Sequence, residues 1–161
     1  MNTILKSDNS SWQYICNKCF KRQGECDCKS TLLGIDPNII KALQILHRKN
    51  YQTVGCCEGH IITYKTPKGT IYTQLSQGYI TLDSHSYNDI QREKEKGFNF
   101  TITPIDPKTN RYQILIPGRK VKMDRFEDFQ VIKKVQLASL EECLEKFAVR
   151  DRREPIILTN Y

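Results

Sequence analysis

The 161-residue sequence has no long apolar run, no low-complexity tract and no internal repeat. No stretch reaches the roughly 18 consecutive apolar residues of a membrane-spanning helix, which excludes such a helix. Met1 to Ser11 holds one lysine and no apolar segment of the kind found in secretory signals, so we expect a cytoplasmic protein without membrane partners. Apolar residues make up 39% and charged residues 27%, a composition that excludes a disordered polymer and supports a buried core.

The charge balance is modestly basic. The chain carries 25 Lys and Arg against 18 Asp and Glu, a formal net charge of +7. Ten basic and five acidic residues lie in positions 1–80, and 15 and 13 in the rest, so there is no basic tail. This excess favours encounter with polyanions without identifying a function.

Seven cysteines in a chain without a secretory signal indicate a reducing compartment and metal binding rather than disulfides. Four of them form a C-x2-C-x6-C-x-C pattern, and Gly24 allows a bend before the second pair. Four thiolates in a tetrahedral set favour zinc and leave no open position for water. We therefore predict one structural Zn²⁺ per chain, bound by Cys16, Cys19, Cys26 and Cys28.

Three basic residues, Lys18, Lys21 and Arg22, lie between the two cysteine pairs. They are candidates for contacting phosphate groups. The alternative is that they offset the negative charge of the zinc–thiolate cluster.

The segment Gly55-Cys-Cys-Glu-Gly-His60 follows a strand-like stretch and is the second candidate site. In one interpretation Cys57 is a nucleophile, His60 its base and Glu58 the residue that orients the base. In another, cysteine, His60 and His85 bind a second metal with an open position. In the third, the segment is a tight turn whose side chains only pack locally. Because neighbouring side chains on a strand alternate faces, we expect Cys57 to face outward and the preceding cysteine to be buried.

The remaining pattern predicts an α+β body. Asp36 as N-cap and Pro37 at the first helical position predict a helix over 36–49. Ser139 and Glu142 form a capping-box pattern that predicts a second helix over 139–150. Alternating strands between these helices predict a mostly antiparallel sheet packed by two or three helices. The expected organisation is a flexible N-terminus (1–11), a zinc knuckle (12–30) and an α+β domain (31–161).

The four-cysteine pattern, the predicted helix that follows it and the segment Cys56-Cys57-Glu58-Gly59-His60 together resemble uncharacterised small proteins of Firmicute bacteria and their phages. The resemblance covers about residues 12–83 and implies a small cytosolic or phage-encoded protein without implying an activity. The central turn also has a faint similarity to tRNA wybutosine-synthesis methyltransferase-like proteins. It departs from that family because it has no serine run and no terminal arginine, so no catalytic residue is carried over.

These observations favour a non-enzymatic, zinc-stabilised protein that binds nucleic acid or a nucleoprotein. Through the resemblance alone, the target would be a host nuclease or RNA-guided defence effector that a phage product inhibits. The first alternative is a small enzyme that uses Cys57, Glu58 and His60. The second is a protein-interaction module that uses the apolar tail at 156–158. The expected contact residues, besides those of the knuckle, are Arg119, Lys120, Lys122 and Arg125.

Overall fold

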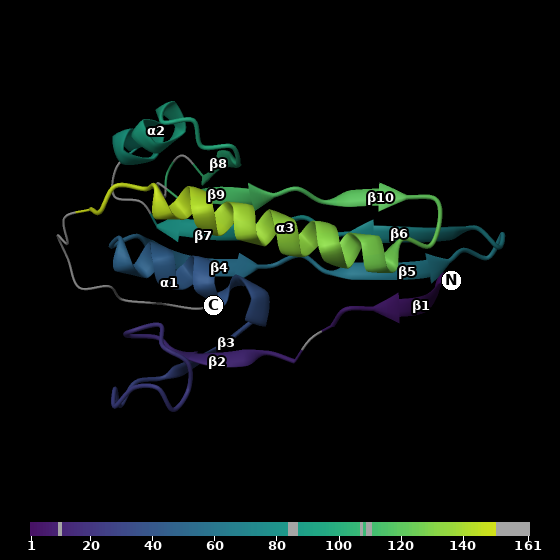
Figure 1. Ribbon diagram of the computed structural model, residues 1–161, viewed down its shortest axis with the longest axis horizontal. Helices are drawn as coiled ribbons and strands as arrows, with labels where there is room; N and C mark the ends of the chain where they lie inside the picture. The colour runs from purple at the N-terminus through teal and green to yellow at the C-terminus, as the bar shows by residue number, and fades with distance from the viewer. Residues whose placement is uncertain (10, 84–86, 107, 109–110, 151–161) are drawn as a thin grey trace.

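The computed structural model describes residues 1–9, 11–83, 87–106, 108 and 111–150. It confirms an α+β fold in which the paired strands are antiparallel. Two four-stranded sheets replace the single sheet that the sequence predicted. Figure 1 shows them along the long axis of the molecule, with a small strand pair to one side.

The first sheet has the strand order β1-β5-β6-β10, and the second has the order β4-β7-β9-β8. The separate pair is β2-β3. The strands are β1 (Thr3–Ser7), β2 (Gln13–Cys16), β3 (Leu32–Ile35), β4 (Gln52–Cys57), β5 (Ile61–Lys65), β6 (Ile71–Leu75), β7 (Gly78–Asp83), β8 (Thr101–Asp106), β9 (Arg111–Ile116) and β10 (Arg119–Val121). The helices are the 3-10 turn η1 (Pro37–Ile39), α1 (Ile40–Arg48), α2 (Tyr87–Glu95) and α3 (Phe126–Glu145).

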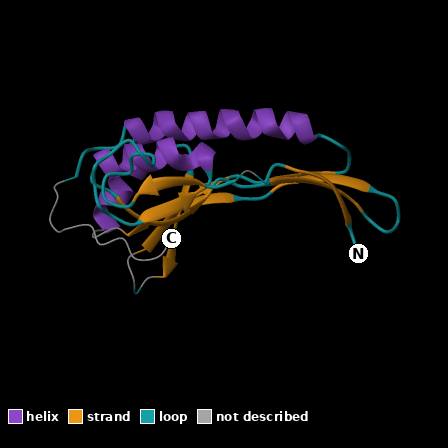
Figure 2. Cartoon of the chain, turned by 90° about the horizontal axis from the view of Figure 1, so that it is seen from below, coloured by secondary structure: helices purple, strands orange, loops and turns teal. Residues whose placement is uncertain are grey.

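Helix α3 lies along one side of both sheets (Figure 2). Its first turns pack Phe126 and Phe129 on the first sheet, and its last turns pack Leu140 and Leu144 into the main core with α1. The prediction of a helix over 139–150 is therefore wrong in both bounds. The helix begins at Phe126 because its buried stripe continues towards the N-terminus. The sequence did not show this extension, because a lysine, Lys133, occupies one of the buried positions and interrupts the apolar period.

The N-terminal segment also differs from expectation. Residues 3–7 of the supposed flexible stretch 1–11 form β1, which pairs with β5 at the edge of the first sheet. The pairing is extended by Asp8, whose carboxylate accepts a hydrogen bond of 2.6 Å from the Ile61 amide. A strand of mostly polar, exposed side chains carries little hydrophobic signal, which is why its sequence resembles a loop.

Helix α1 packs as its apolar period predicts, with Leu43 and Leu46 fully buried. Asn50 adopts a left-handed conformation (φ 61°) and ends the helical segment, as expected. Its start differs, because η1 precedes α1 and the Asp36 side chain makes no capping hydrogen bond. The Asp36 carboxylate is used elsewhere, as described below.

None of the described helices has the length and apolar character needed to cross a membrane. His85 and the apolar tail at 156–158, both singled out in the sequence, lie outside the described residues.

Candidate metal centres

The four cysteines of the N-terminal motif form one cluster. Cys16 ends β2, and the other three lie in the loop that leads to β3. The Sγ atoms of Cys16, Cys19, Cys26 and Cys28 all lie within 4.8 Å of one another, and all seven cysteines of the chain are free thiols. This arrangement is compatible with one metal ion held by four sulfurs, as the spacing predicted.

The backbone around Cys16 forms a tight turn with amides directed at the sulfur. Phe20 adopts a positive φ of 59° and its amide donates to the Cys16 carbonyl at 2.9 Å, which closes a tight turn. The Lys18 amide points at Cys16 Sγ from 3.4 Å. Burial opposes ionisation of Cys16, but hydrogen bonds from the backbone amides of Cys19 and Lys18, together with those from the neighbouring thiols, outweigh it and lower the thiol pKa to about 7. The thiolate that a metal requires is therefore already favoured here.

The cysteine module is docked on the body. Ile15 and Phe20 are buried members of the main core. The Phe20 ring stacks on His47 of α1 with centroids 4.6 Å apart, and Gln44 donates a 2.9 Å hydrogen bond to the Phe20 carbonyl. The module is thus part of the hydrophobic core and is not a tethered arm.

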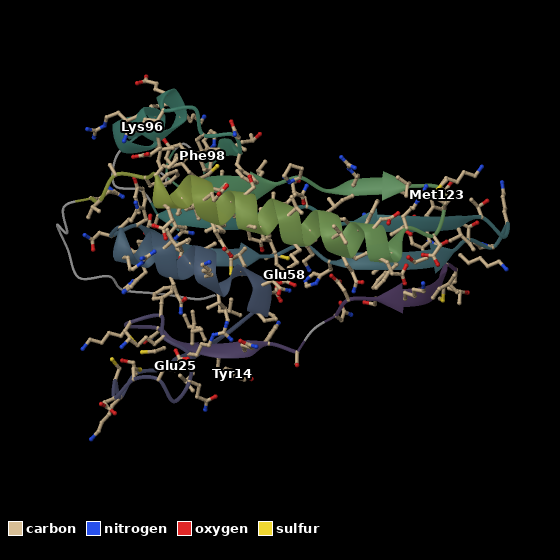
Figure 3. The ribbon with its side chains drawn as sticks, in the orientation of Figure 1. Tyr14, Glu25, Glu58, Lys96, Phe98 and Met123 are labelled. Atoms are coloured by element: carbon tan, nitrogen blue, oxygen red, sulfur yellow. The ribbon has the colours of Figure 1, made fainter. Side chains whose placement is uncertain are left out.

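The structure separates the two groups of predicted contact residues. Lys18, Lys21 and Arg22 are exposed on the cysteine module, and Arg22 donates hydrogen bonds to Gln13 and Glu25. Figure 3 places Glu25 of this module and Met123, which follows β10, at opposite ends of the molecule. The knuckle residues and those around β10 therefore do not share one surface. The second group is Arg119, Lys120, Lys122 and Arg125, all of them exposed.

A second cluster brings together Asp36, Cys57 and His60, with one ligand atom of each within 4.8 Å of the others. Cys57 ends β4, His60 precedes β5, and Asp36 lies between β3 and η1. Cys56 packs against the main core, as expected for one of the two adjacent thiols, and Cys57 beside it is half-buried. The cluster lies where the chain passes from the second sheet into the first.

The turn between Cys57 and His60 depends on Gly59. Its φ is +82°, and a Cβ at this position would lie 2.6 Å from the Ser76 carbonyl oxygen. The Ser76 hydroxyl in turn accepts a 2.8 Å hydrogen bond from the His60 amide. A side chain at position 59 would push His60 away from Asp36, so the glycine is required by the geometry of the site.

Buried charges surround this second cluster. Glu58 lies under α3 near the middle of the molecule (Figure 3) and is 1% exposed. Its carboxylate accepts hydrogen bonds from the amide and side chain of Asn38 and from Lys133 Nζ at 2.6 Å. Lys133 also contacts Asp8 at 2.9 Å. The carboxylates beside the imidazole are those of Asp36 and Asp8, so Glu58 does not orient His60 in the way the sequence interpretation proposed.

The thiol pKa values bear on the nucleophile hypothesis. Burial raises the pKa of Cys57, and the nearby carboxylates of Asp36 and Glu58 raise it further, although the Gly59 amide and Lys133 act in the opposite direction. A nucleophilic cysteine needs a lowered pKa at neutral pH. Since the pKa of Cys57 is raised despite Lys133, this thiol lacks the activation that the hypothesis requires.

Burial raises the pKa of Cys56 to about 12, from 9.0 for a free thiol. Because the unfolded chain loses this proton first, the free energy of unfolding should fall as the pH rises from about 9 towards 12. Urea denaturation of the wild type and of Cys56→Ala at pH 8, 9.5 and 10.5 measures the effect. The wild type should lose more stability than the variant over this range, and parallel pH profiles would contradict the prediction.

The sequence did not reveal Asp36 as a member of the second cluster, nor Asp8 and Lys133 as the charged residues beside it. Asp36 was read as a helix cap, and Asp8 lay in a segment without apparent structure. Lys133 had a detectable signal, because stepping back by three or four residues from Leu144, Leu140 and Leu137 places it on the buried face of a helix.

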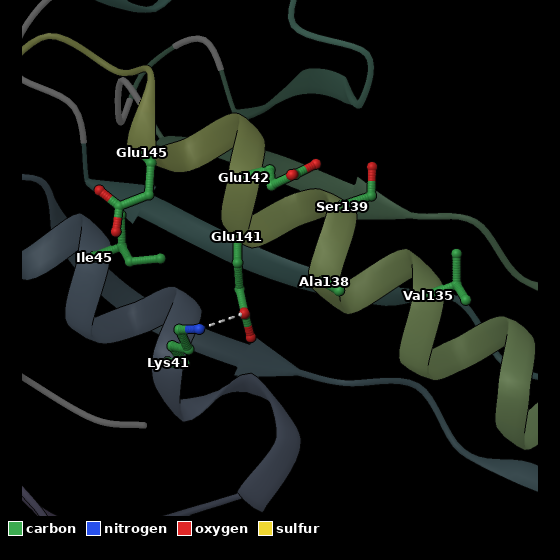
Figure 4. Close-up of a pocket in the computed structure, with 8 residues that line it drawn as sticks. All are labelled: Lys41, Ile45, Val135, Ala138, Ser139, Glu141, Glu142 and Glu145. Atoms are coloured by element: carbon green, nitrogen blue, oxygen red, sulfur yellow. Dashed lines mark ion pairs between the residues drawn. The ribbon is translucent and has the colours of Figure 1, made fainter.

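A groove of about 520 Å³ lies between α1 and α3, and no residue of either cysteine cluster lines it (Figure 4). Lys41 forms an ion pair of 3.3 Å with Glu141 across it, and Glu142 and Glu145 add negative charge. None of the groups predicted to do chemistry lines this groove.

Comparison with protein-family models, curated proteins and solved structures finds no significant match to this chain.

Proposed function

We propose that the protein is a zinc-stabilised binding protein that contacts single-stranded nucleic acid through the open face of the first sheet. The observation that carries the proposal is a cation held on an aromatic pair. Lys120 Nζ lies 4.8 Å from the ring centre of Tyr72 and 5.6 Å from that of Tyr64. The two tyrosine rings stack with centroids 5.7 Å apart.

The register of the strands puts these residues on the face that α3 does not cover. Tyr64 lies directly opposite Tyr72 on the neighbouring strand. Val121 is the neighbour of Lys120 on β10, and Ile61 lies three residues before Tyr64 on β5. Both side chains pack towards α3. Since successive side chains alternate, Lys120 and the tyrosines point to the other side. Tyr64 is buried there at 7% exposure, so partly exposed Tyr72 and exposed Lys120 form the accessible surface of this group. Proteins that bind single strands combine aromatic stacking surfaces with lysines that follow the phosphates.

The charges at this end of the molecule also favour a polyanion. Exposed lysines extend from the β5–β6 turn to the residues after β10. The nearby acids are already paired, since Asp124 and Glu127 contact Lys6, and Asp128 contacts Arg125 at 2.9 Å. Arg125 is thereby the least available of the predicted contact residues. The exposed cations at this end are Lys65, Lys68, Arg119, Lys120 and Lys122. Among those on strands, Lys120 points to the same side as the tyrosines, whereas Lys65 and Arg119 alternate to the side of α3.

The test is binding of fluorescently labelled single-stranded RNA and DNA, followed by anisotropy. Four phosphate contacts on a single strand predict about 50-fold weaker binding at 200 mM than at 50 mM salt. Lys120→Glu/Lys122→Glu should abolish most of the binding, because it removes two cations and adds two repulsive charges. Lys134→Glu/Lys146→Glu is the matched control, since it makes the same change in net charge at exposed positions at and beyond α3.

Equal losses in the two double variants would show a non-specific charge effect and overturn the proposal, as would an affinity independent of salt. A third variant, Lys21→Glu/Arg22→Glu, tests whether the cysteine module contributes a separate contact. A host nuclease or RNA-guided effector as the target stays a prediction from the resemblance alone.

A further inference from the structure

We propose that Asp36, Cys57 and His60 form a second metal site, for a zinc-class cation, with one open coordination position. The proposal does not depend on nucleic-acid binding, because these three residues lie where the two sheets join and are not among those proposed to contact nucleic acid. A thiolate, an imidazole and a carboxylate form a donor set that favours zinc over magnesium or calcium.

The spacing of the donor atoms fits one ion. His60 Nε2 lies 3.7 Å from Asp36 Oδ2, and Cys57 Sγ completes a triangle with sides of at most 4.8 Å. Zinc bonds of 2.0–2.3 Å at tetrahedral angles place neighbouring ligand atoms about 3.3–3.8 Å apart. A distance of 3.7 Å is too long for a hydrogen bond between the imidazole and the carboxylate. It is the distance expected for two ligands that share an ion.

The imidazole of His60 is also left without a hydrogen bond on its other side. Its Nδ1 is buried and has no hydrogen-bond partner among the described residues, and Asp8 Oδ1 lies 4.0 Å away. Buried polar atoms without partners are rare and costly. With a metal on Nε2, Nδ1 carries the proton and points it at Asp8. Asp8 therefore lies behind the imidazole, where metal-binding histidines usually have a carboxylate, although 4.0 Å is longer than a hydrogen bond.

The groups around the site carry a net negative charge that a divalent cation can neutralise. Three carboxylates, those of Asp8, Asp36 and Glu58, meet one ammonium group, that of Lys133. This leaves two negative charges before the Cys57 thiol ionises. The Gly59 amide lies 3.5 Å from Cys57 Sγ, as backbone amides do around metal-bound thiolates. A cation at the centre of the triangle neutralises the excess.

Three protein ligands distinguish this site from the four-cysteine cluster. The fourth position is reachable, because the His60 side chain is 34% exposed. Closed four-sulfur sites are structural, whereas three-ligand sites hold a water molecule or another exchangeable ligand. The site thus has the coordination that the enzyme hypothesis requires, with Asp36 as its third ligand.

Zinc stoichiometry tests the proposal. The full chain is purified without chelator, saturated with Zn²⁺, desalted, and analysed by native mass spectrometry and elemental analysis. We expect two zinc ions in the wild type and one in both His60→Ala and Cys57→Ser. Cys56→Ala is the matched control and should keep two, because its side chain faces the core. Far-UV circular dichroism establishes that each variant is folded.

Cobalt gives a second readout on the wild type alone. Titration with Co²⁺ should saturate at two equivalents, with the first showing the absorption of a four-thiolate site and the second a weaker sulfur band. If the wild type binds a single ion per chain in the zinc experiment and again in the cobalt experiment, the proposal is overturned while the four-cysteine site is left intact. Two zinc ions retained in folded His60→Ala would place the second ion elsewhere and would equally overturn it.

Discussion

Cys19→Ser should lower the free energy of unfolding by about 3–6 kcal/mol and reduce the zinc bound at the cysteine module to none. The size follows from what the metal holds in place. Ile15 and Phe20 are 0% and 2% exposed, and burying one such side chain fully contributes about 1.5–3 kcal/mol. Without a fourth ligand the loop that carries Phe20 loses its cross-link, and both side chains are released from the core.

Urea denaturation under reducing conditions measures the loss, with zinc content determined on the same samples. Cys143→Ser on α3 is the control, because it removes a thiol that belongs to neither cluster. A strong chelator added to the wild type should reproduce the destabilisation, and Zn²⁺ should reverse it. A variant as stable as the wild type would mean that the module folds without metal.

The cysteine module was the part of the candidate sites best predicted from the sequence. Four thiols within a span of 13 residues constrain one another through chain connectivity alone, so their spacing is sufficient to predict the cluster. Docking was not predictable, because it depends on Phe20 stacking on His47, a contact across 27 positions. Long-range packing of this kind leaves no local pattern.

The second cluster shows the opposite case. The glycines and the adjacent thiols correctly indicated a turn with one cysteine packed on the core, since alternation on a strand is a local rule. The other cysteine, Cys57, was expected to face outward and is half-buried. The charged residues in and around this cluster come from the residue after β1, from the β3–η1 junction and from α3, which are far apart in the chain. Because Asp36 fits the position of a helix cap, its sequence context did not indicate that its carboxylate lies beside His60. In the structure its carboxylate accepts a 3.2 Å hydrogen bond from the Glu58 amide.

The α+β class was predicted because strand alternation and the period of α1 are strong local signals. The division into two sheets was not, since it arises where β4 ends at Cys57 and β5 begins after Gly59. The same break creates the second cluster. The feature that local rules could not predict is therefore the one that assembles the candidate site.

Lys133→Met should destabilise the protein by about 3–5 kcal/mol, the usual result of removing one partner from a buried ion pair. Lys133 is 6% exposed and is the ammonium partner of both Glu58 and Asp8. Methionine fills a similar volume, so the loss reports the uncompensated carboxylates rather than a cavity. Lys134→Met is the control, because this neighbouring lysine is exposed and its replacement should change stability by less than about 0.5 kcal/mol.

The double variant Lys133→Met/Glu58→Gln separates charge from packing. Removing the Glu58 charge as well should recover part of the stability, so that the double variant is more stable than Lys133→Met alone. Equal stabilities of the two would show that lost packing, not the ion pair, is responsible.

The pH dependence gives an independent test of the same ion pair. Burial disfavours the ammonium form of Lys133, but its hydrogen bonds to Asp8 and Glu58 outweigh burial and raise the pKa above 10.5. The stabilisation is therefore complete below pH 10.5, the value for an unfolded lysine, and is lost as the pH rises through the higher value of the folded state. The difference in unfolding free energy between wild type and Lys133→Met should stay constant from pH 7 to 10 and shrink only above that range. A difference that disappears near neutrality would mean that Lys133 is not held as a charged partner, and that the carboxylates around His60 are neutralised in another way.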